Sequence, residues 1–316
     1  VFLEVLEQIS QVAPLNKPVL VIGERGTGKE LIAARLHYLS QRWDQHYQKL
    51  NCAALNESLL ESELFGYEAG AFTGASKRRE GRFEIANNGT LFLDELANTS
   101  AMIQEKLLRV VEYGEFERVG GSKTVKVDVR LVAATNEDLP ALAANGEFRA
   151  DLLDRLAFDV ITIPPLRERR EDIMVLAEHF AINMARELEM ELFSGFSSKA
   201  SDILLNHSWP GNIRELKNVV ERAVYRNNNP HVPVHEIVLD PFASHFRPQQ
   251  RIKAPSTLPV QSVAAAQNNG STAPQPPVHQ SAQSASSGQI NPVEALTNNT
   301  LPQDNKLTKN IQFPID

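Results

Sequence analysis

A glycine-rich octapeptide follows a short apolar run early in the sequence. The apolar run covers residues 18–22, residues 23–30 read GERGTGKE, and helical periodicity begins at Leu31. A strand, then G-x-x-x-x-G-K, then a helix is typical of a loop whose backbone N–H groups surround phosphate oxygens while the lysine adds a positive charge. The pattern predicts a phosphate-binding site at Gly23, Glu24, Arg25, Gly26, Thr27, Gly28, Lys29 and Glu30. Glu30 departs from the pattern, because a Ser or Thr at this position normally helps to hold Mg²⁺.

Apolar runs alternate with a helical pattern as far as residue 167. Residues 91–93 and 131–134 are continuous apolar runs, as buried parallel strands require. Residues 102–113, between them, carry apolar side chains at helical spacing. The alternation predicts an α/β domain with a mostly parallel sheet over residues 1–167.

Polar side chains follow both of these runs. Asp94 and Glu95 come directly after the first, where acids lie at the carboxyl edge of a sheet and phosphate ligands bind. Asp94 is expected to hold Mg²⁺, directly or through water, and Glu95 is expected to orient and polarise the attacking water. Thr135 and Asn136 follow the second run. They either sense the terminal phosphate or, in the case of Asn136, cap the next helix.

Residues 168–243 carry helical patterns with no strand between them. The patterns cover residues 173–188, 198–205 and 212–225. Ser197 or Ser198 and Asn212 are the expected N-caps of the last two helices. This region is therefore predicted to be a small all-helical second domain.

The composition changes sharply near residue 244. Between residues 254 and 303 the single charged side chain is Glu294, and Gln, Asn, Ser, Ala and Pro dominate. Such a composition cannot bury enough apolar surface to offset the entropy of the chain. Residues 244–316 are therefore predicted to be a flexible, disordered linker.

The overall composition excludes several classes of protein. The net charge of −7 argues against bulk electrostatic binding to nucleic acid as the main function, and leaves room only for a local basic patch. Cys52 is the single cysteine, which excludes an internal disulfide and a multi-cysteine metal site. No apolar run approaches the ~20 residues that span a bilayer, and no signal-peptide pattern is present. These features predict a soluble, cytoplasmic protein.

Three further motifs complete a family pattern. Residues 63–68 read ELFGYE, residues 70–75 read GAFTGA and residues 209–216 read WPGNIREL. With the phosphate loop and the polar strand ends, they make residues 1–243 resemble the AAA+ ATPases. More narrowly, this region resembles the bacterial enhancer-binding proteins that activate sigma-54 RNA polymerase.

The resemblance implies a P-loop NTPase core followed by a helical lid. It implies that ATP, with Mg²⁺, is hydrolysed by a homo-oligomeric ring, expected to be a hexamer, with sites between subunits. Hydrolysis would remodel closed promoter complexes of sigma-54 RNA polymerase into open ones. The implied sigma-54 contact is the loop of Gly70, Ala71, Phe72, Thr73, Gly74 and Ala75.

The resemblance also assigns roles to residues outside the phosphate loop. Arg149 and Arg155 match arginine fingers that are donated to the ATP of a neighbouring subunit. From the residues alone, a salt-bridged helix face with two nearby aspartates explains both arginines. Arg214 matches the second sensor, on a lid helix, and Asn51 matches the residue that restrains the catalytic glutamate.

Two surface features have alternative interpretations. Within the family the chain is similar to the phage-shock activators, which implies that an exposed Trp43 contacts the inhibitory phage shock protein A. The alternative is a half-buried ring that packs against its own domain. The basic residues 77–79 either face promoter DNA or are simply solvated. Basic residues of the 212–225 helix alternate with glutamates, which argues against a DNA-reading helix.

Two elements of the family pattern are not found. The upstream segment that helps to form the adenine pocket is largely missing, and after Ile237 no pair of helices around a glycine turn is visible. We therefore expect this chain to remodel polymerase, with DNA recognition left to a C-terminal domain that it lacks. Two rival functions remain. A protein unfoldase would carry an aromatic pore motif instead of residues 70–75, and a scaffold without turnover would not need Glu95 and two fingers.

Overall fold

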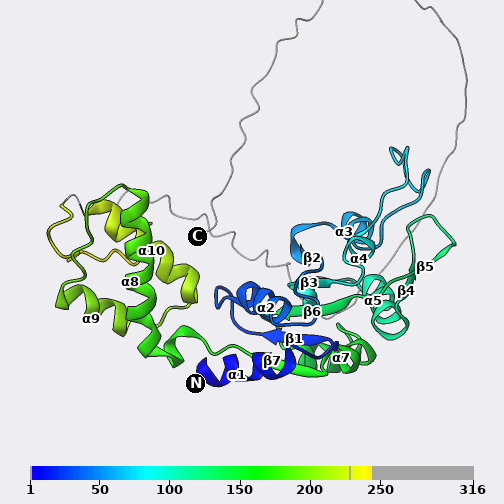
Figure 1. The fold of residues 1–316 in the computed structure, drawn as a ribbon, viewed down its shortest axis with the longest axis horizontal. Coiled ribbons are helices and arrows are strands. Elements are labelled where there is room, and N and C mark those ends of the chain that lie inside the picture. Colours follow the sequence, from blue (N-terminus) through cyan, green and yellow to red (C-terminus); the bar gives the residue numbers. More distant parts are fainter. Residues whose placement is uncertain (1, 228, 244–316) are drawn as a thin grey trace, which may run out of the picture. The chain divides into compact units, whose positions relative to one another are not determined.

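The computed structural model describes residues 2–227 and 229–243, which form an α/β unit and a group of helices (Figure 1). The strands are β1 (Val19–Ile22), β2 (Tyr47–Asn51), β3 (Thr90–Asp94), β4 (Glu115–Glu117), β5 (Thr124–Lys126), β6 (Arg130–Thr135) and β7 (Asp159–Thr162). The helices are α1 (Phe2–Val12), α2 (Lys29–Tyr38), α3 (Glu57–Phe65), α4 (Arg82–Ile85), α5 (Ala101–Tyr113), α6 (Leu139–Ala144), α7 (Ala150–Leu156), α8 (Arg170–Glu187), α9 (Ser198–Asn206) and α10 (Asn212–Arg226). Short 3-10 turns are η1 (Cys52–Ala54), η2 (Leu96–Asn98) and η3 (Leu166–Glu168). The predicted linker over residues 244–316 lies outside the described residues.

Five strands form one parallel sheet in the order β2-β3-β6-β1-β7. Strand β6 is the middle strand, and β1 lies between β6 and β7, where Ile22 pairs with Thr135 of β6 on one side and with Thr162 of β7 on the other. Toward the other edge, β3 pairs with β2, so that Asn51 is opposite Asp94. The parallel order confirms the predicted α/β fold class.

Alternate residues of the central strands contribute to two separate cores. One core contains Leu20, Leu91, Leu93, Leu131 and Ala133, with Ile103 and Leu107 of α5 and Leu152 and Leu156 of α7. The other contains Val19, Val21, Phe92, Val132 and Ala134, with Val5 and Ile9 of α1 and Ile32 and Leu36 of α2. Burial on both faces explains why β3 and β6 are continuously apolar in sequence.

The helices α8, α9 and α10 pack around Trp209 and confirm the predicted helical lid (Figure 1). Trp209 is fully buried and donates its indole N–H to the carbonyl of Leu204 at 2.9 Å. Along α8, buried alanines recur every four residues, which lets a neighbouring helix approach closely. Neither α8, the longest described helix, nor any other in the described ranges is long and apolar enough to cross a membrane.

The two expected N-caps of the lid differ in outcome. Ser197 caps α9 by accepting from the backbone N–H of Ala200, as predicted. The prediction for Asn212 is wrong, because Gly211 occupies the cap position and Asn212 is the first helical residue, with a φ of 53°. Its side chain is fully buried and is used by tertiary hydrogen bonds instead of its own helix.

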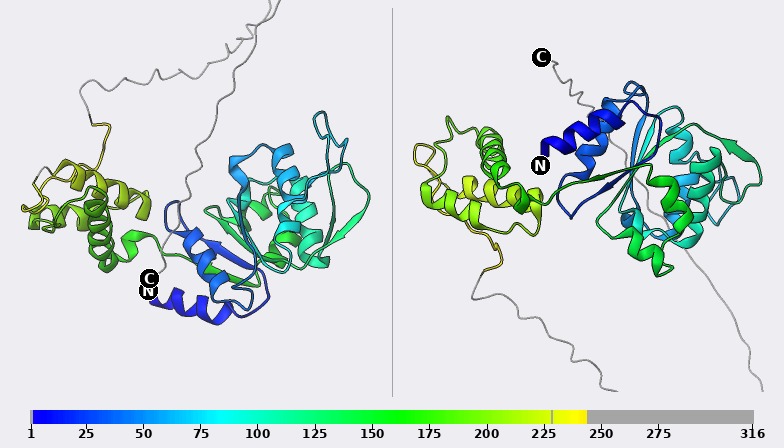
Figure 2. Two further views of the ribbon diagram at one scale, coloured as in Figure 1. Left: turned by 45° about the horizontal axis from the view of Figure 1, so that its top comes forward. Right: turned by 90° about the horizontal axis from the view of Figure 1, so that it is seen from below.

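Residues 66–81 form an arm that projects from the α/β unit beside the β4–β5 hairpin (Figure 2). Tyr67 pairs with Arg79 across the arm and with Val119 next to the hairpin. The GAFTGA sequence therefore lies at the outer end of the arm, beyond these pairings.

Candidate nucleotide-binding site

Residues singled out from the sequence meet where three parallel strands end. Gly23 follows β1, Asp94 is the last residue of β3, and Thr135 is the last residue of β6. The N–H of Gly23 donates to the carbonyl of Thr135 at 3.2 Å, which ties the start of the glycine-rich loop to the neighbouring strand. In open α/β sheets, ligands bind outside this carboxyl edge.

The glycine-rich loop leads into the N-terminus of α2. Gly26 and Gly28 have φ values of 79° and 97°, a region that residues with side chains rarely adopt. A Cβ added at Gly28 would approach no atom closer than 3.9 Å, so its positive φ, and not crowding, favours glycine there. Backbone N–H groups at a helix N-terminus point outward and favour an anion.

Lys29 is a buried cation in this loop. It is 7% exposed, and its Nζ donates to the carbonyls of Gly23 at 2.9 Å and Glu24 at 3.3 Å. Burial lowers the pKa of Lys29, and the nearby carboxylates of Asp94 and Glu95 oppose that shift. Among the described residues no ion pair reaches Lys29, so an anionic phosphate oxygen fits beside Nζ.

The acidic groups near the loop differ in their access to a metal ion. Glu30 pairs with Lys49 at 2.7 Å, and both side chains are more than half exposed, so Glu30 lies at the surface. Asp94 lies at the sheet edge, where its Oδ1 accepts from the N–H of Glu95 at 3.0 Å. In the described part of the chain, no three His, Cys, Asp or Glu side chains gather to hold a metal alone. Mg²⁺ keeps waters and binds through one or two carboxylates plus phosphate oxygens, which fits Asp94.

The carboxylate of Glu95 is contacted by Asn136 in this structure. With its amide NH₂ turned toward Glu95, Asn136 donates to both carboxylate oxygens, with an N···Oε1 distance of 3.1 Å. Asn51, which the resemblance makes the restraint on Glu95, accepts instead from the N–H of Ala53 at 2.9 Å and caps η1. The hydroxyl of the fully buried Thr135 accepts from the N–H of Glu137. The role assigned to Asn51 stays a prediction.

The two arginines expected to act as fingers are exposed and paired within the chain. Arg149 contacts Asp151 with two hydrogen bonds of 3.0 and 2.7 Å. Arg155 bonds to Glu112 of α5 at 2.7 Å. These partners lie outside the phosphate loop and the acidic pair. From the residues alone, both arginines were expected to pair with nearby aspartates. Arg149 does so, whereas the partner of Arg155 comes from another helix.

The arm presents Phe72 at its outer end. Phe72 is 46% exposed and meets the ring of Tyr67 edge-on, with centroids 4.9 Å apart. Gly70 and Gly74 have positive φ, and a Cβ added at either would meet no atom within 4 Å. The Phe72 ring therefore contacts the Tyr67 ring and does not join one of the hydrophobic cores.

A buried arginine anchors the base of the arm. Arg118 bonds to Glu68 at 2.8 Å and to both oxygens of Glu84, and these bonds raise the pKa of Arg118. In the basic flank, Arg79 pairs with Glu63 at 2.9 Å and Arg78 is 3.4 Å from Glu80. Two of the three flanking charges are thus already neutralised within the chain, which favours the solvated interpretation over a DNA contact.

Trp43 lies in the turn after α2 and is 63% exposed. The adjacent Arg42 fixes this turn through two bonds to the carboxylate of Asp128, each 2.8 Å long, and one to the carbonyl of Gly89. The exposure argues against half-buried packing, and the partner of Trp43 stays a prediction.

Lid residues reach the phosphate loop from α10. The backbone N–H of Arg214, the expected second sensor, donates to the carbonyl of Gly26 at 3.3 Å. Asn212 also bonds to the loop, although its sequence context indicated only a helix cap. The sequence signal for this role was the position of Asn212 directly after Pro210-Gly211. Asn tolerates the left-handed conformation that follows a tight turn, and its side chain is then free to bond to other segments.

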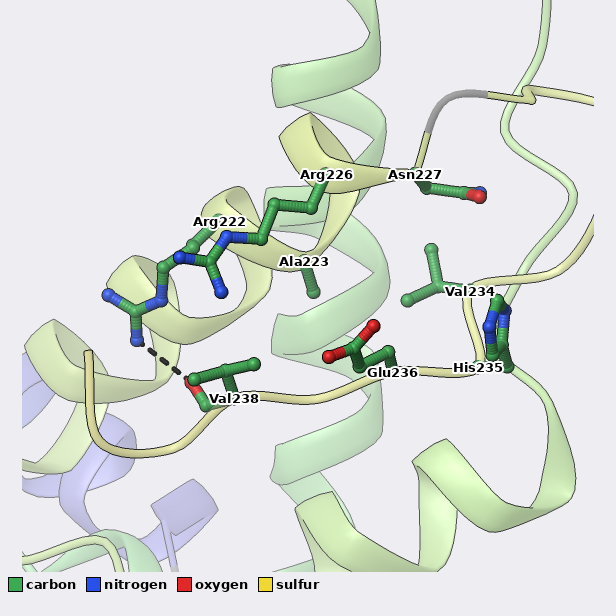
Figure 3. A pocket seen from close by; sticks show the side chains of 8 residues that line it. All are labelled: Arg222, Ala223, Arg226, Asn227, Val234, His235, Glu236 and Val238. Carbon is green, nitrogen blue, oxygen red and sulfur yellow. Dashed lines mark hydrogen bonds between the residues drawn. The ribbon is translucent and has the colours of Figure 1, made fainter. Parts of the chain in front are cut away.

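A separate pocket in the lid does not suit a nucleotide. It lies between α10 and the segment that carries Glu236, and Arg222 donates to the carbonyl of Val238 at 3.0 Å along its wall (Figure 3). Its volume of about 40 Å³ holds only a few waters. This pocket is therefore too small for a nucleotide.

A phosphate loop at the edge of a parallel sheet, an acidic pair on a nearby strand and a helical lid bonded to the loop define a nucleotide-binding protein of the AAA+ class. A model of the sigma-54 interaction domain matches residues 1–163, and one of the AAA+ ATPase lid domain matches residues 167–255. The chain belongs to the family of sigma-54-dependent transcriptional activators, as its motifs predicted.

Similar proteins share most of the described region. The Psp operon transcriptional activator of Escherichia coli (strain K12) is 68% identical over 241 residues, 76% of this chain and 74% of that protein. The Nif-specific regulatory protein of Herbaspirillum seropedicae is 57% identical over 219 residues, 69% of this chain and 40% of that protein. NtrX from Brucella abortus in complex with ATP matches with a TM-score of 0.69 at 37% identity, covering 74% of this chain and 51% of that one. This chain thus spans about half or less of the last two proteins.

Proposed function

We propose that this chain hydrolyses ATP and uses the cycle to move its arm against sigma-54, which converts closed promoter complexes into open ones. The observation that carries the proposal is the meeting of Lys29, Asp94 and Glu95 at one sheet edge, in a chain whose arm presents Phe72 to solvent. Family membership supports sigma-54 as the partner, and NtrX solved with ATP supports the nucleotide.

The proposed chemistry uses groups whose positions follow from the fold. Backbone N–H groups at the start of α2 and the ammonium of Lys29 bind the phosphates. Glu95 accepts a hydrogen bond from water and takes its proton as the water oxygen attacks the γ-phosphorus and the bond to ADP breaks. Asn136 holds the Glu95 carboxylate in one orientation. Bound Mg²⁺, held by Asp94, phosphate oxygens and water, would neutralise charge on the phosphates.

The fingers require a second subunit in this proposal. Arg149 and Arg155 lie on the surface, and ion pairs between exposed groups are weak because water screens the charges. Such pairs exchange readily for a phosphate on a neighbouring copy, because a planar guanidinium fits the charge of the transferring phosphoryl group. A homo-oligomeric ring, expected to be a hexamer, supplies that arrangement.

The arm is the proposed contact with sigma-54. Phe72 and Thr73 are exposed at its end, and the Arg118 ion pairs hold its base. An aromatic ring with a neighbouring hydroxyl is a suitable grip on a protein surface. We also propose that the exposed Trp43 is the contact for phage shock protein A, and that enhancer DNA is recognised outside the described residues.

The test combines two measurements on one preparation. Phosphate release should depend on Glu95, and a gel shift with an ATP transition-state analogue should show a stable complex with sigma-54. Hydrolysis without any sigma-54 complex would leave an AAA+ ATPase with another target. A complex without hydrolysis would favour a nucleotide-binding scaffold.

A further inference from the structure

The lid contacts the backbone of the phosphate loop at two consecutive residues, Arg25 and Gly26. A Cβ at Gly26 would lie 2.2 Å from the carbonyl oxygen of Gly211, which real structures do not allow. The carbonyl of Gly26 accepts from the N–H of Arg214, and the carbonyl of Arg25 accepts from the side chain of Asn212. Gly26 is therefore required by the approach of the lid as well as by its positive φ.

Asn212 is the centre of this contact. Its carboxamide NH₂ donates to Glu24 Oε2 at 3.0 Å and to the carbonyl of Arg25 at 3.1 Å, while its Oδ1 accepts from the N–H of Leu166 at 2.8 Å. The residue has no exposed surface. One side chain of the lid thus bonds at once to the phosphate loop and to the connection between the α/β unit and the lid.

Glu24 completes the contact from the side of the loop. Its carboxylate accepts from Arg167 at 2.7 and 2.9 Å as well as from Asn212, and these bonds lower the pKa of Glu24. Glu24 places a negative charge in a loop that binds phosphates, which by itself opposes ligand binding. Its partners indicate that it shapes the loop instead.

We propose that Asn212 and Glu24 are positioning residues that hold the phosphate loop in its binding shape from the lid side. This inference rests on the proposed ATP binding and extends it. Because coupling between two equilibria is reciprocal, a lid seated on the loop strengthens nucleotide binding, and bound nucleotide strengthens the seating of the lid by the same factor. Neither residue needs to touch the nucleotide.

The first test changes the donor of Asn212 without changing its shape. Asn212→Asp keeps the acceptor for Leu166 but places a carboxylate oxygen against Glu24 and the carbonyl of Arg25. Titration with a fluorescent, non-hydrolysable ATP analogue should show about tenfold weaker binding, because two hydrogen bonds are lost and like charges face each other. Asn218→Asp, the same change at an exposed position of α10, should bind like the unchanged chain.

The second test reverses the polarity of the pair. In Glu24→Gln combined with Asn212→Asp, the glutamine amide can donate to the new carboxylate and its oxygen can accept from Arg167. The double variant should bind the analogue more tightly than Asn212→Asp alone. A merely structural defect would not be repaired by a change in the loop. A double variant as weak as the single one would overturn the proposal.

The third test covers the case in which Asn212→Asp unfolds the lid. Trp209 in a Trp43→Phe background is the single tryptophan, so its emission reports whether the lid core is intact. Glu24→Ala is a loop change that leaves this core untouched. Glu24→Ala should weaken binding of the analogue about threefold, because the loop loses its bonds to Asn212 and Arg167. If Glu24 acted only through its negative charge, the variant would bind the analogue more tightly, which would contradict the proposal. If the unchanged chain binds no analogue, the proposed function itself is wrong. If all variants bind the analogue normally, only the proposed role of Asn212 and Glu24 is wrong.

Discussion

The carboxamide of Asn136 faces both carboxylate oxygens of Glu95, at the edge where β3 and β6 end, and donates to both when its NH₂ is turned toward them. This contact orients the Glu95 carboxylate, which is the group proposed to activate water. Asn136→Ala should therefore lower the turnover of ATP about tenfold or more and change nucleotide affinity little, because the carboxylate loses its orientation but the loop is unchanged. Steady-state phosphate release and analogue titration measure the two effects. Normal turnover in this variant would show that the contact has no catalytic role.

Lys29 and Glu95 should separate binding from hydrolysis. Lys29→Ala removes the close cation and should weaken nucleotide affinity roughly 10- to 100-fold. Glu95→Ala should keep affinity and lower turnover by roughly 100-fold or more. Fluorescent-nucleotide titration and phosphate release on the same samples check both. Normal hydrolysis by Glu95→Ala would remove Glu95 as the water-polarising residue.

The fingers should act across a subunit boundary. An Arg155→Ala chain and a Glu95→Ala chain are each expected to be inactive, and mixing them should restore some hydrolysis, because mixed rings contain interfaces with both groups intact. Co-purification of the untagged chain through an affinity tag on the other chain checks that mixed rings form. If they form and no activity returns, the assignment of Arg155 to a neighbouring site is wrong.

The buried His37 should make stability depend on pH. Its Nδ1 lies 3.0 Å from the hydroxyl of Thr90, and burial first, then the charge of Arg130, lowers the pKa of His37 below 6.5. Between the folded and unfolded pKa values the unfolded chain binds more protons, so the free energy of unfolding should fall as pH drops below 6.5.

Thermal unfolding of the unchanged chain and of His37→Gln, from about pH 8 to about pH 5, measures this effect. Gln keeps a hydrogen-bonding group for Thr90 but does not titrate. The loss of stability at acidic pH should be smaller in the variant, and equal losses would contradict the interpretation.

The parts of the fold that depend on local pattern could be predicted from sequence. The phosphate loop and the continuous apolar runs of β3 and β6 identify the parallel sheet, because strands buried on both faces must be apolar throughout. By contrast, β2 reads YQKLN and is an edge strand that is only half-buried, so it lacks a clear signal. The three-residue strands β4 and β5 are too short to show a period.

Side-chain partners that come from distant segments could not be predicted. Arg155 pairs with Glu112, 43 residues away, instead of a neighbouring aspartate. Asn212 reads as a helix cap in sequence, yet it bonds to Glu24, 188 residues away. Both outcomes depend on which distant segments pack together, and that information is not present in the local sequence.

ATP hydrolysis is proposed to be coupled to sigma-54 through Phe72 and Thr73. None of the proposed ATP chemistry uses these residues, and both are exposed at the end of the arm. Phe72→Ala and Thr73→Ala should therefore keep phosphate release within about twofold, a typical tolerance for an exposed site. They should abolish the stable sigma-54 complex and open-complex formation.

The most direct measurement is a gel shift of sigma-54 with the Phe72→Ala chain and an ATP transition-state analogue, paired with phosphate release on the same preparation. Coupling through Phe72 predicts normal phosphate release and no shifted complex. A shifted complex as strong as that of the unchanged chain would contradict it.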